Sequence, residues 1–119
     1  MLTSVSHWLV GLVAFVQSVI AAIEIFLWNI ESVHRRLNFD AAEARKMAGV
    51  VANAGLYNAF LAGGLIWGLN DASDGHRIEV FFLSCVAIAG LFGAPTLKKW
   101  TPLALQTVPA ALALYGIRS

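Results

Sequence analysis

The sequence predicts an all-α integral membrane protein, a four-helix bundle that forms one transmembrane domain over residues 1–119. The first observation is composition: 59% of the residues are hydrophobic and 13% are charged, the latter about half the share in an average soluble domain. The mean hydropathy is +0.73. A soluble domain of this size has too little interior to cover so much apolar surface. The other observations are the apolar segments and the placement of the basic residues.

Four segments are apolar over lengths close to the roughly 20 residues that a helix needs to cross a bilayer. The first segment contains one charged residue, Glu24, and the other three contain none. The third and fourth segments are at the short end of the usual range. We expect the spans at residues 8–30, 47–69, 80–97 and 100–117.

The segment ends carry residues typical of a membrane boundary or of a helix start. Tryptophan favours the headgroup level of a bilayer, and every tryptophan in the chain falls at or near an expected span end. Asp40 and Glu43 form the pattern of a capping box, which predicts that the second helix begins near Ala41, before its apolar stretch. The tryptophans are Trp8, Trp28, Trp67 and Trp100.

The basic residues predict the orientation, because lysine and arginine are concentrated in the cytoplasmic loops of membrane proteins. Six of the eight lie in two loops, at residues 31–46 and 98–99. The opposite side has only Arg77 and Arg118. We therefore expect these loops in the cytoplasm, both termini outside, and a multi-pass protein of the bacterial inner membrane.

Composition and motifs argue against several function classes. The net charge of +1 and the lack of a basic patch with interleaved aromatic residues argue against nucleic-acid binding. Cys85 is the single cysteine, so no intrachain disulfide forms. His7, His34 and His76 fall at span ends on both sides of the membrane, so we expect no metal site and no cofactor. Common catalytic motifs are missing, which favours a protein that is not an enzyme.

Polar side chains recur at one depth within the expected spans. At about 1.5 Å per residue, Glu24 of the first span and Asn53 of the second lie at similar depths, and Gln106 of the fourth lies close to that level. Tyr57 and Asn58 lie at the middle of the second span. An ionised carboxylate at this depth costs about 2.5 kcal/mol or more. Glu24 must therefore be partnered, protonated or in contact with water.

The first helix adds two residues to this group. Gln17, Glu24 and Trp28 share one helical stripe, because they are spaced at seven and four residues. A cluster of these side chains would form a polar site inside the membrane. The candidate ligand-binding residues are Gln17, Glu24, Trp28, Asn53, Tyr57, Asn58 and Gln106.

Backbone features predict close helix packing near the cluster. The second span and its flanks hold five of the ten glycines, and small residues let helices approach closely in lipid. We therefore expect this helix at the centre of the bundle, and its glycine-rich face also suits a homo-oligomer. In the fourth span, Pro109 has no N–H to donate to Leu105, which leaves a freed carbonyl beside Gln106.

Three motifs resemble those of domain-of-unknown-function family 1304. They are Glu24 with Leu27-Trp28 (ExxLW), the segment 53–65 (NAGLYNAFLAGGL), and Gln106 with Pro109-Ala110 (QxxPA). The resemblance covers essentially the whole chain. It implies a small four-helix bacterial membrane protein and supplies no established activity.

Three functions fit these observations. The favoured one is binding or transport of a small ligand, and a carboxylate with Trp28 and Tyr57 nearby suits a cationic or protonatable molecule. The alternative is a structural or accessory membrane subunit whose polar side chains form interhelical hydrogen bonds, each worth about 0.6–2 kcal/mol. A membrane-embedded enzyme that uses Glu24 as acid or base on a lipid-soluble substrate is less favoured. Bilayer lipids are expected partners in all three.

Overall fold

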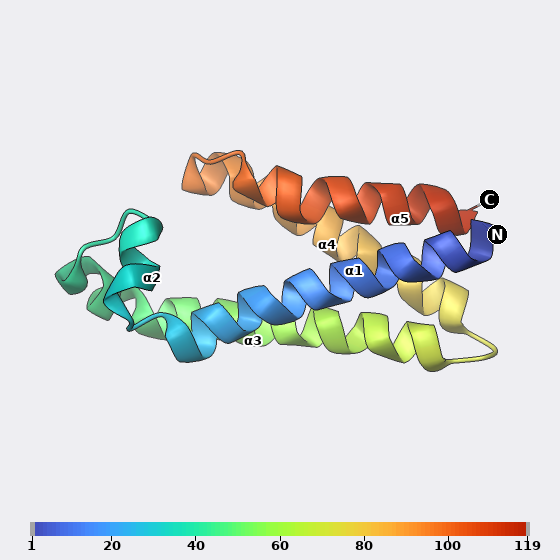
Figure 1. The fold of residues 1–119 in the computed structure, drawn as a ribbon, viewed down its shortest axis with the longest axis horizontal. Coiled ribbons are helices and arrows are strands. Elements are labelled where there is room, and N and C mark those ends of the chain that lie inside the picture. Colours follow the sequence, from blue (N-terminus) through green and yellow to red (C-terminus); the bar gives the residue numbers. More distant parts are fainter. Residues whose placement is uncertain (1, 119) are drawn as a thin grey trace. The chain divides into compact units, whose positions relative to one another are not determined.

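The computed structural model describes residues 2–118, in which all of the regular secondary structure is helical (Figure 1). The all-α prediction is therefore confirmed. The helices in chain order are α1 (Leu2–Ala22), the π-helix η1 (Ile23–Leu27), α2 (Glu31–Arg36), α3 (Ala41–Asn70), α4 (Gly75–Leu97), the π-helix η2 (Leu103–Thr107) and α5 (Val108–Arg118).

Three helical stretches are long and apolar enough to cross a membrane: Val5–Leu27, Ala41–Asn70 and Gly75–Thr96. The fourth expected span is a shorter apolar helix, Leu103–Ile117. It begins with η2, where the Val108 N–H donates to the carbonyl of Leu103 five residues earlier. Pro109 follows directly and has no N–H to donate, so we attribute the irregular turn to it.

Two helix ends fall where expected, the start of α3 at Ala41 and the end of α4 at Leu97, whereas other ends differ from the expected span ends. The Glu43 N–H donates to Asp40 Oδ1 at 2.8 Å and the Asp40 N–H donates to Glu43 Oε1 at 3.4 Å, so the predicted capping box and the start at Ala41 are confirmed. The first helical stretch ends at Leu27, earlier than expected. α4 begins at Gly75, five residues before the expected span, because the helix continues through polar residues beyond its apolar part.

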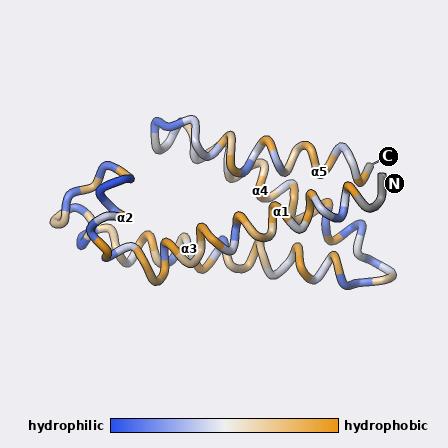
Figure 2. The backbone as a smooth tube through the Cα atoms, in the orientation of Figure 1, coloured by the Kyte–Doolittle hydropathy of each residue, from blue (hydrophilic) through white to orange (hydrophobic). Residues whose placement is uncertain are grey.

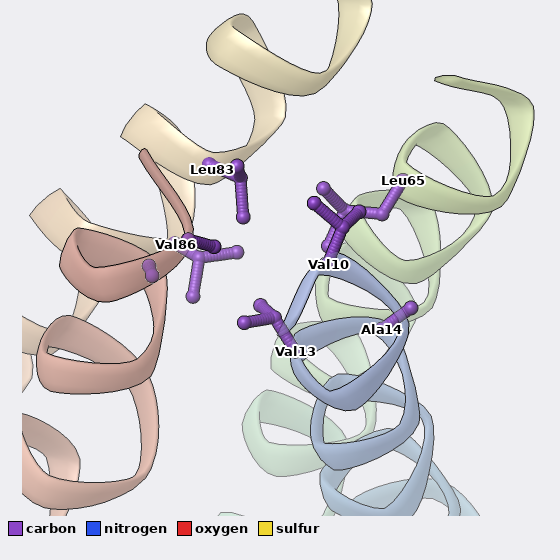
Figure 3. Packing of buried hydrophobic residues seen from close by; sticks show 8 residues of the cluster. Val10, Val13, Ala14, Leu65, Leu83 and Val86 are labelled. Carbon is purple, nitrogen blue, oxygen red and sulfur yellow. The ribbon is translucent and has the colours of Figure 1, made fainter. Parts of the chain in front are cut away.

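The chain divides into two compact units. Unit 1 comprises Met1–Gln17 and Leu61–Ser119, and its core joins α1, α3, α4 and α5. Figure 3 shows side chains of α1 and α3 close to one another and others of α4 directed toward them. The buried core residues are Val10, Val13, Ala14, Leu65, Leu83, Val86, Ala110 and Ala113.

In unit 1, α4 also packs closely on the η2–α5 segment. A Cβ atom on Gly90 would lie 2.7 Å from the carbonyl oxygen of Pro102 and would overlap the Thr107 side chain. Thr107 Oγ1 donates to the Ala87 carbonyl at 2.9 Å. Glycine at position 90 therefore lets the two segments approach closely enough for this interhelical hydrogen bond.

Unit 2 comprises Ser18–Phe60: the end of α1, η1, α2 and the first part of α3. Six-residue helices are marginal on their own, and α2 is held by buried side chains. Trp28 donates from Nε1 to the Ala44 carbonyl at 2.8 Å. Its ring contacts those of Phe39 and His34 at centroid distances of 5.3 and 6.4 Å. These contacts fasten α2 to the beginning of α3.

Large apolar side chains lie on the outside of the helices. Trp8, Phe26 and Phe92 are each more than 70% exposed. A large number of exposed apolar side chains is unusual for a soluble monomer. Figure 2 shows the hydrophilic residues gathered around α2, at the α3–α4 turn and at the turn after α4. Helix surfaces between these turns are mostly apolar, as expected for contact with lipid.

Candidate functional site

The strongest candidate site is a hydrogen-bonded pair in unit 2. Asn58 Nδ2 of α3 donates to Glu24 Oε1 of η1 at 2.7 Å, and both side chains are half-buried. A hydrogen bond to a carboxylate is stronger than one between neutral groups. An ionised carboxylate has about four lone-pair sites, so one amide leaves Glu24 able to accept further donors.

Gly55 positions this pair. A Cβ atom on Gly55 would lie 2.8 Å from Ile25 Cγ1 and 2.9 Å from Glu24 Cβ, well inside the 3.5–4.0 Å optimum for carbon atoms. Asn58 follows Gly55 by three residues and therefore lies on the same side of α3. The close approach of η1 to α3 at Gly55 brings the amide to the carboxylate.

The π-helical turn is the second local feature of the site. Glu24 is the second residue of η1 (Ile23–Leu27). A π turn widens the helix and changes the direction of the side chains that follow it, and such turns are frequent at functional sites. The sequence around Glu24 contains no proline or glycine that predicts this turn.

The other two polar candidates on α3 lie on its outside. Asn53 is exposed, and Tyr57 is 59% exposed and contacts the ring of Phe60 at a centroid distance of 6.0 Å. The pair with Glu24 is therefore made by Asn58, which the helical spacing places on a different face from Asn53.

Trp28 serves a local structural role. It is 5% exposed, and its indole N–H donates a hydrogen bond to the Ala44 carbonyl. The backbone carbonyl of Trp28 lies 3.0 Å from His34 Nδ1; since a carbonyl only accepts, Nδ1 is the donor. Trp28 thus belongs to the α2 contacts and faces protein, whereas a headgroup-level tryptophan would be exposed to lipid.

Gln17 and Gln106 lie in unit 1, whereas the other candidates lie in unit 2. Gln17 is fully buried. Gln106 lies in η2, and its Oε1 is buried without a hydrogen-bond donor among the described residues. The expectation that Pro109 disturbs the backbone beside Gln106 is matched by the π turn there.

Sequence reasoning missed a buried acid, Glu79. Glu79 of α4 is 4% exposed and packs against Gly68, where a Cβ atom would lie 2.8 Å from Glu79 Cγ. The expected third span begins at residue 80, so Glu79 lies just outside it. The helical phase would have found it, because Glu79 shares a stripe with buried Leu83 and Val86 once the helix begins at Gly75.

A comparison with protein families gives a match over most of the chain. The sequence model of the family described as "Protein of unknown function (DUF1304)" matches residues 11–117. The chain belongs to this family. The resemblance carried by the ExxLW, NAGLYNAFLAGGL and QxxPA motifs is therefore confirmed. The comparison found no match among curated proteins and none among solved structures, so DUF1304 membership assigns no activity to the Glu24–Asn58 pair.

Proposed function

We propose that this DUF1304 protein is a multi-pass membrane protein that binds, and in that way can carry, a small cationic or protonatable ligand at Glu24. The observation that carries the proposal is the Glu24–Asn58 hydrogen bond of 2.7 Å, made within two stretches long and apolar enough to span a bilayer. An acid inside a membrane span is costly unless it is partnered, and such acids mark substrate and ion pathways.

The chemistry of the site favours a donor-rich cation. The carboxylate supplies negative charge and acceptor capacity beyond the one hydrogen bond that it receives from Asn58. Trp28 and Tyr57 contact other aromatic rings. The proposed site therefore consists of the Glu24 carboxylate and the Asn58 amide. It does not include the aromatic rings of Trp28 and Tyr57, which were expected there from the sequence.

Membrane insertion and orientation are part of the proposal. The three apolar helical stretches and the exposed aromatic side chains support insertion in the inner membrane. The concentration of basic residues at 31–46 and 98–99 supports a cytoplasmic position for these turns and outside positions for both termini. The same orientation places the α3–α4 turn outside.

Site-directed labelling tests the orientation. In a Cys85→Ala background, we expect Ser73→Cys to react with a membrane-impermeant maleimide in intact cells. Ser32→Cys, at an exposed position of α2, should react only after the membrane is permeabilised. The reverse pattern would refute the proposed orientation.

Ligand-dependent unfolding tests the site. The probes are methylammonium, guanidinium and tetramethylammonium, with tert-butanol as a neutral compound of similar shape. A ligand at 100 times its Kd stabilises a protein by about 2.7 kcal/mol. We expect at least one cation to stabilise the wild type, and Glu24→Gln, which retains an acceptor for Asn58, to lose that effect. Glu31→Gln, an exposed acid, is the matched control. Equal stabilisation of the wild type and Glu24→Gln would refute the proposal.

A structural role is the second candidate, and the close packing at Gly55 favours it. In that case the Glu24–Asn58 bond fixes the register of η1 against α3. Glu24→Gln would then keep near wild-type stability, Asn58→Ala would lower it by about 0.6–2 kcal/mol, and no probe would stabilise either protein. The two candidates therefore differ in the response to probes as well as in stability.

A further inference from the structure

A second candidate surface lies in unit 1, at the end of α3 and the start of α4. It is a groove of about 570 Å³. Trp67 contributes from α3 and Asp74 from the residue that precedes α4, whereas the remaining residues belong to α4. The groove is lined by Trp67, Asp74, Arg77, Ile78, Phe81 and Phe82.

The turn that forms one end of the groove is ordered by its own hydrogen bonds. Asp71 Oδ1 accepts from the backbone N–H groups of Asp74 at 2.7 Å and Ser73 at 3.1 Å. The bond from Asp74, followed by those from Ser73, holds the pKa of Asp71 below its ordinary value. The Gly68 carbonyl lies so near Gly75 that a Cβ there would be 2.5 Å away. These contacts fix the backbone on which the groove is built.

Two opposite charges face this groove without neutralising each other. Asp74 stands at the N-cap position of α4, yet its side chain makes no capping hydrogen bond. Arg77 is exposed one helical turn later. Within the part of the chain that the structure describes, neither side chain forms an ion pair. A ligand that carries both an anionic and a cationic group complements this arrangement.

The rest of the groove is apolar. Ile78 and Phe81 follow Asp74 by four and seven residues, so the three side chains lie on one face of α4. Phe81 is 63% exposed and Trp67 is 57% exposed. Tryptophan at the end of a membrane helix favours the headgroup level. The groove therefore leads from a pair of charges to a surface suited to a hydrocarbon chain.

We propose that this groove binds a zwitterionic phospholipid with a primary ammonium group, such as phosphatidylethanolamine. Arg77 binds the phosphate, which suits a guanidinium because of its forked donors. Asp74 binds the ammonium, and an acyl chain lies along Ile78 and Phe81. The inference rests on the proposed membrane insertion, and it is independent of the Glu24 site.

Native mass spectrometry of the detergent-purified protein tests the inference, with phosphatidylethanolamine and phosphatidylglycerol of matched chains as probes. The wild type should bind phosphatidylethanolamine about tenfold more tightly, as expected for one charge-assisted contact. Asp74→Asn should remove the preference by weakening phosphatidylethanolamine alone. Arg77→Gln should weaken both lipids about tenfold, because both contain the phosphate.

Matched controls separate the groove from general charge effects. Glu31→Gln and Arg45→Gln each remove an exposed charge elsewhere and should leave both affinities unchanged. Asp74→Glu and Arg77→Lys keep the charges and should restore part of the binding if the fold is intact. Free phosphoethanolamine lacks the acyl chains and should compete poorly; equal competition would identify a soluble zwitterion and overturn the lipid proposal.

The outcomes also separate this inference from the proposed function. Equal binding of the two lipids, or a preference that survives in Asp74→Asn, overturns the groove proposal alone. Glu24→Gln should keep the lipid preference whether or not the Glu24 site binds cations. Release of the protein from membranes by alkaline carbonate would instead contradict membrane insertion, on which both proposals depend.

Discussion

Replacing Gly55 with alanine tests how the Glu24–Asn58 pair is positioned. The new Cβ atom would lie 2.8 Å from Ile25 Cγ1 and 3.2 Å from the Ala21 carbonyl oxygen. The carbonyl belongs to the backbone and cannot rotate away. Restoring an ordinary carbon–carbon separation of about 3.5 Å requires a displacement of about 0.7 Å at Ile25. Overpacking of this kind costs about 1–3 kcal/mol.

Gly49→Ala is the matched control on the same helix. A Cβ atom on Gly49 meets nothing within 4 Å, so this variant receives only the helix-forming advantage of alanine, about 0.5–1 kcal/mol. Gly55→Ala receives the same advantage and the overpacking as well. We therefore expect Gly55→Ala to be less stable than Gly49→Ala by about 1–3 kcal/mol.

Reversible unfolding in mixed micelles, monitored by circular dichroism, measures this difference. Hydrogen–deuterium exchange should also increase in residues 23–27 of Gly55→Ala and stay unchanged in Gly49→Ala. Equal stability of the two variants, with equal exchange, would mean that η1 does not contact α3 at Gly55. The structural reason given for the Glu24–Asn58 bond would then be wrong.

Three further predictions concern other contacts. Trp28→Phe removes the indole donor to the Ala44 carbonyl, which keeps its partner within α3, and should lower stability by about 0.5–1.5 kcal/mol. Trypsin should then cleave faster at Arg35 and Arg36, whereas Trp100→Phe, at an exposed residue, should leave cleavage unchanged. The hydrogen bond from the Glu43 N–H lowers the pKa of Asp40. The cap is therefore fully formed above the pKa of an unfolded aspartate, about 3.9, and is lost as the pH falls through the lower pKa of the folded state. Amide protection in residues 41–44 should fall in that pH range, and protection that persists well below it would refute Asp40 as the cap. Thr107→Val removes the interhelical bond to Ala87 and should lower stability by about 0.6–1.7 kcal/mol, whereas Thr96→Val, whose hydroxyl bonds within its own helix, should change it less.

The sequence predicts well what depends on local chemistry and hydropathy. Three of the four expected spans correspond to long apolar helical stretches, and Asp40 with Glu43 located the start of α3. Hydropathy marks the part of a helix suited to lipid and misses helix ends in polar residues. For this reason the expected span begins at residue 80, whereas α4 begins at Gly75 and includes the buried Glu79.

Tertiary contacts explain the features that the sequence did not predict. α2 is held by Trp28 and Phe39 rather than by its own helix propensity. Helical spacing places Asn53 and Tyr57 on one face of α3. The hydrogen bond to Glu24 is instead made by Asn58, because η1 contacts α3 at Gly55. The partner of Glu24 depends on which face of α3 contacts η1, and the sequence of neither segment alone determines that face.

Infrared difference spectroscopy observes the Glu24 carboxyl group itself, the group that we propose binds the ligand. The protein in lipid is exposed to the methylammonium, guanidinium and tetramethylammonium probes, and the carboxyl and carboxylate bands are recorded with and without each. A change of these bands in the wild type and in Glu31→Gln, absent in Glu24→Gln, is the predicted result. Bands that stay constant with every probe, or that change equally in Glu24→Gln, would contradict a ligand site at Glu24.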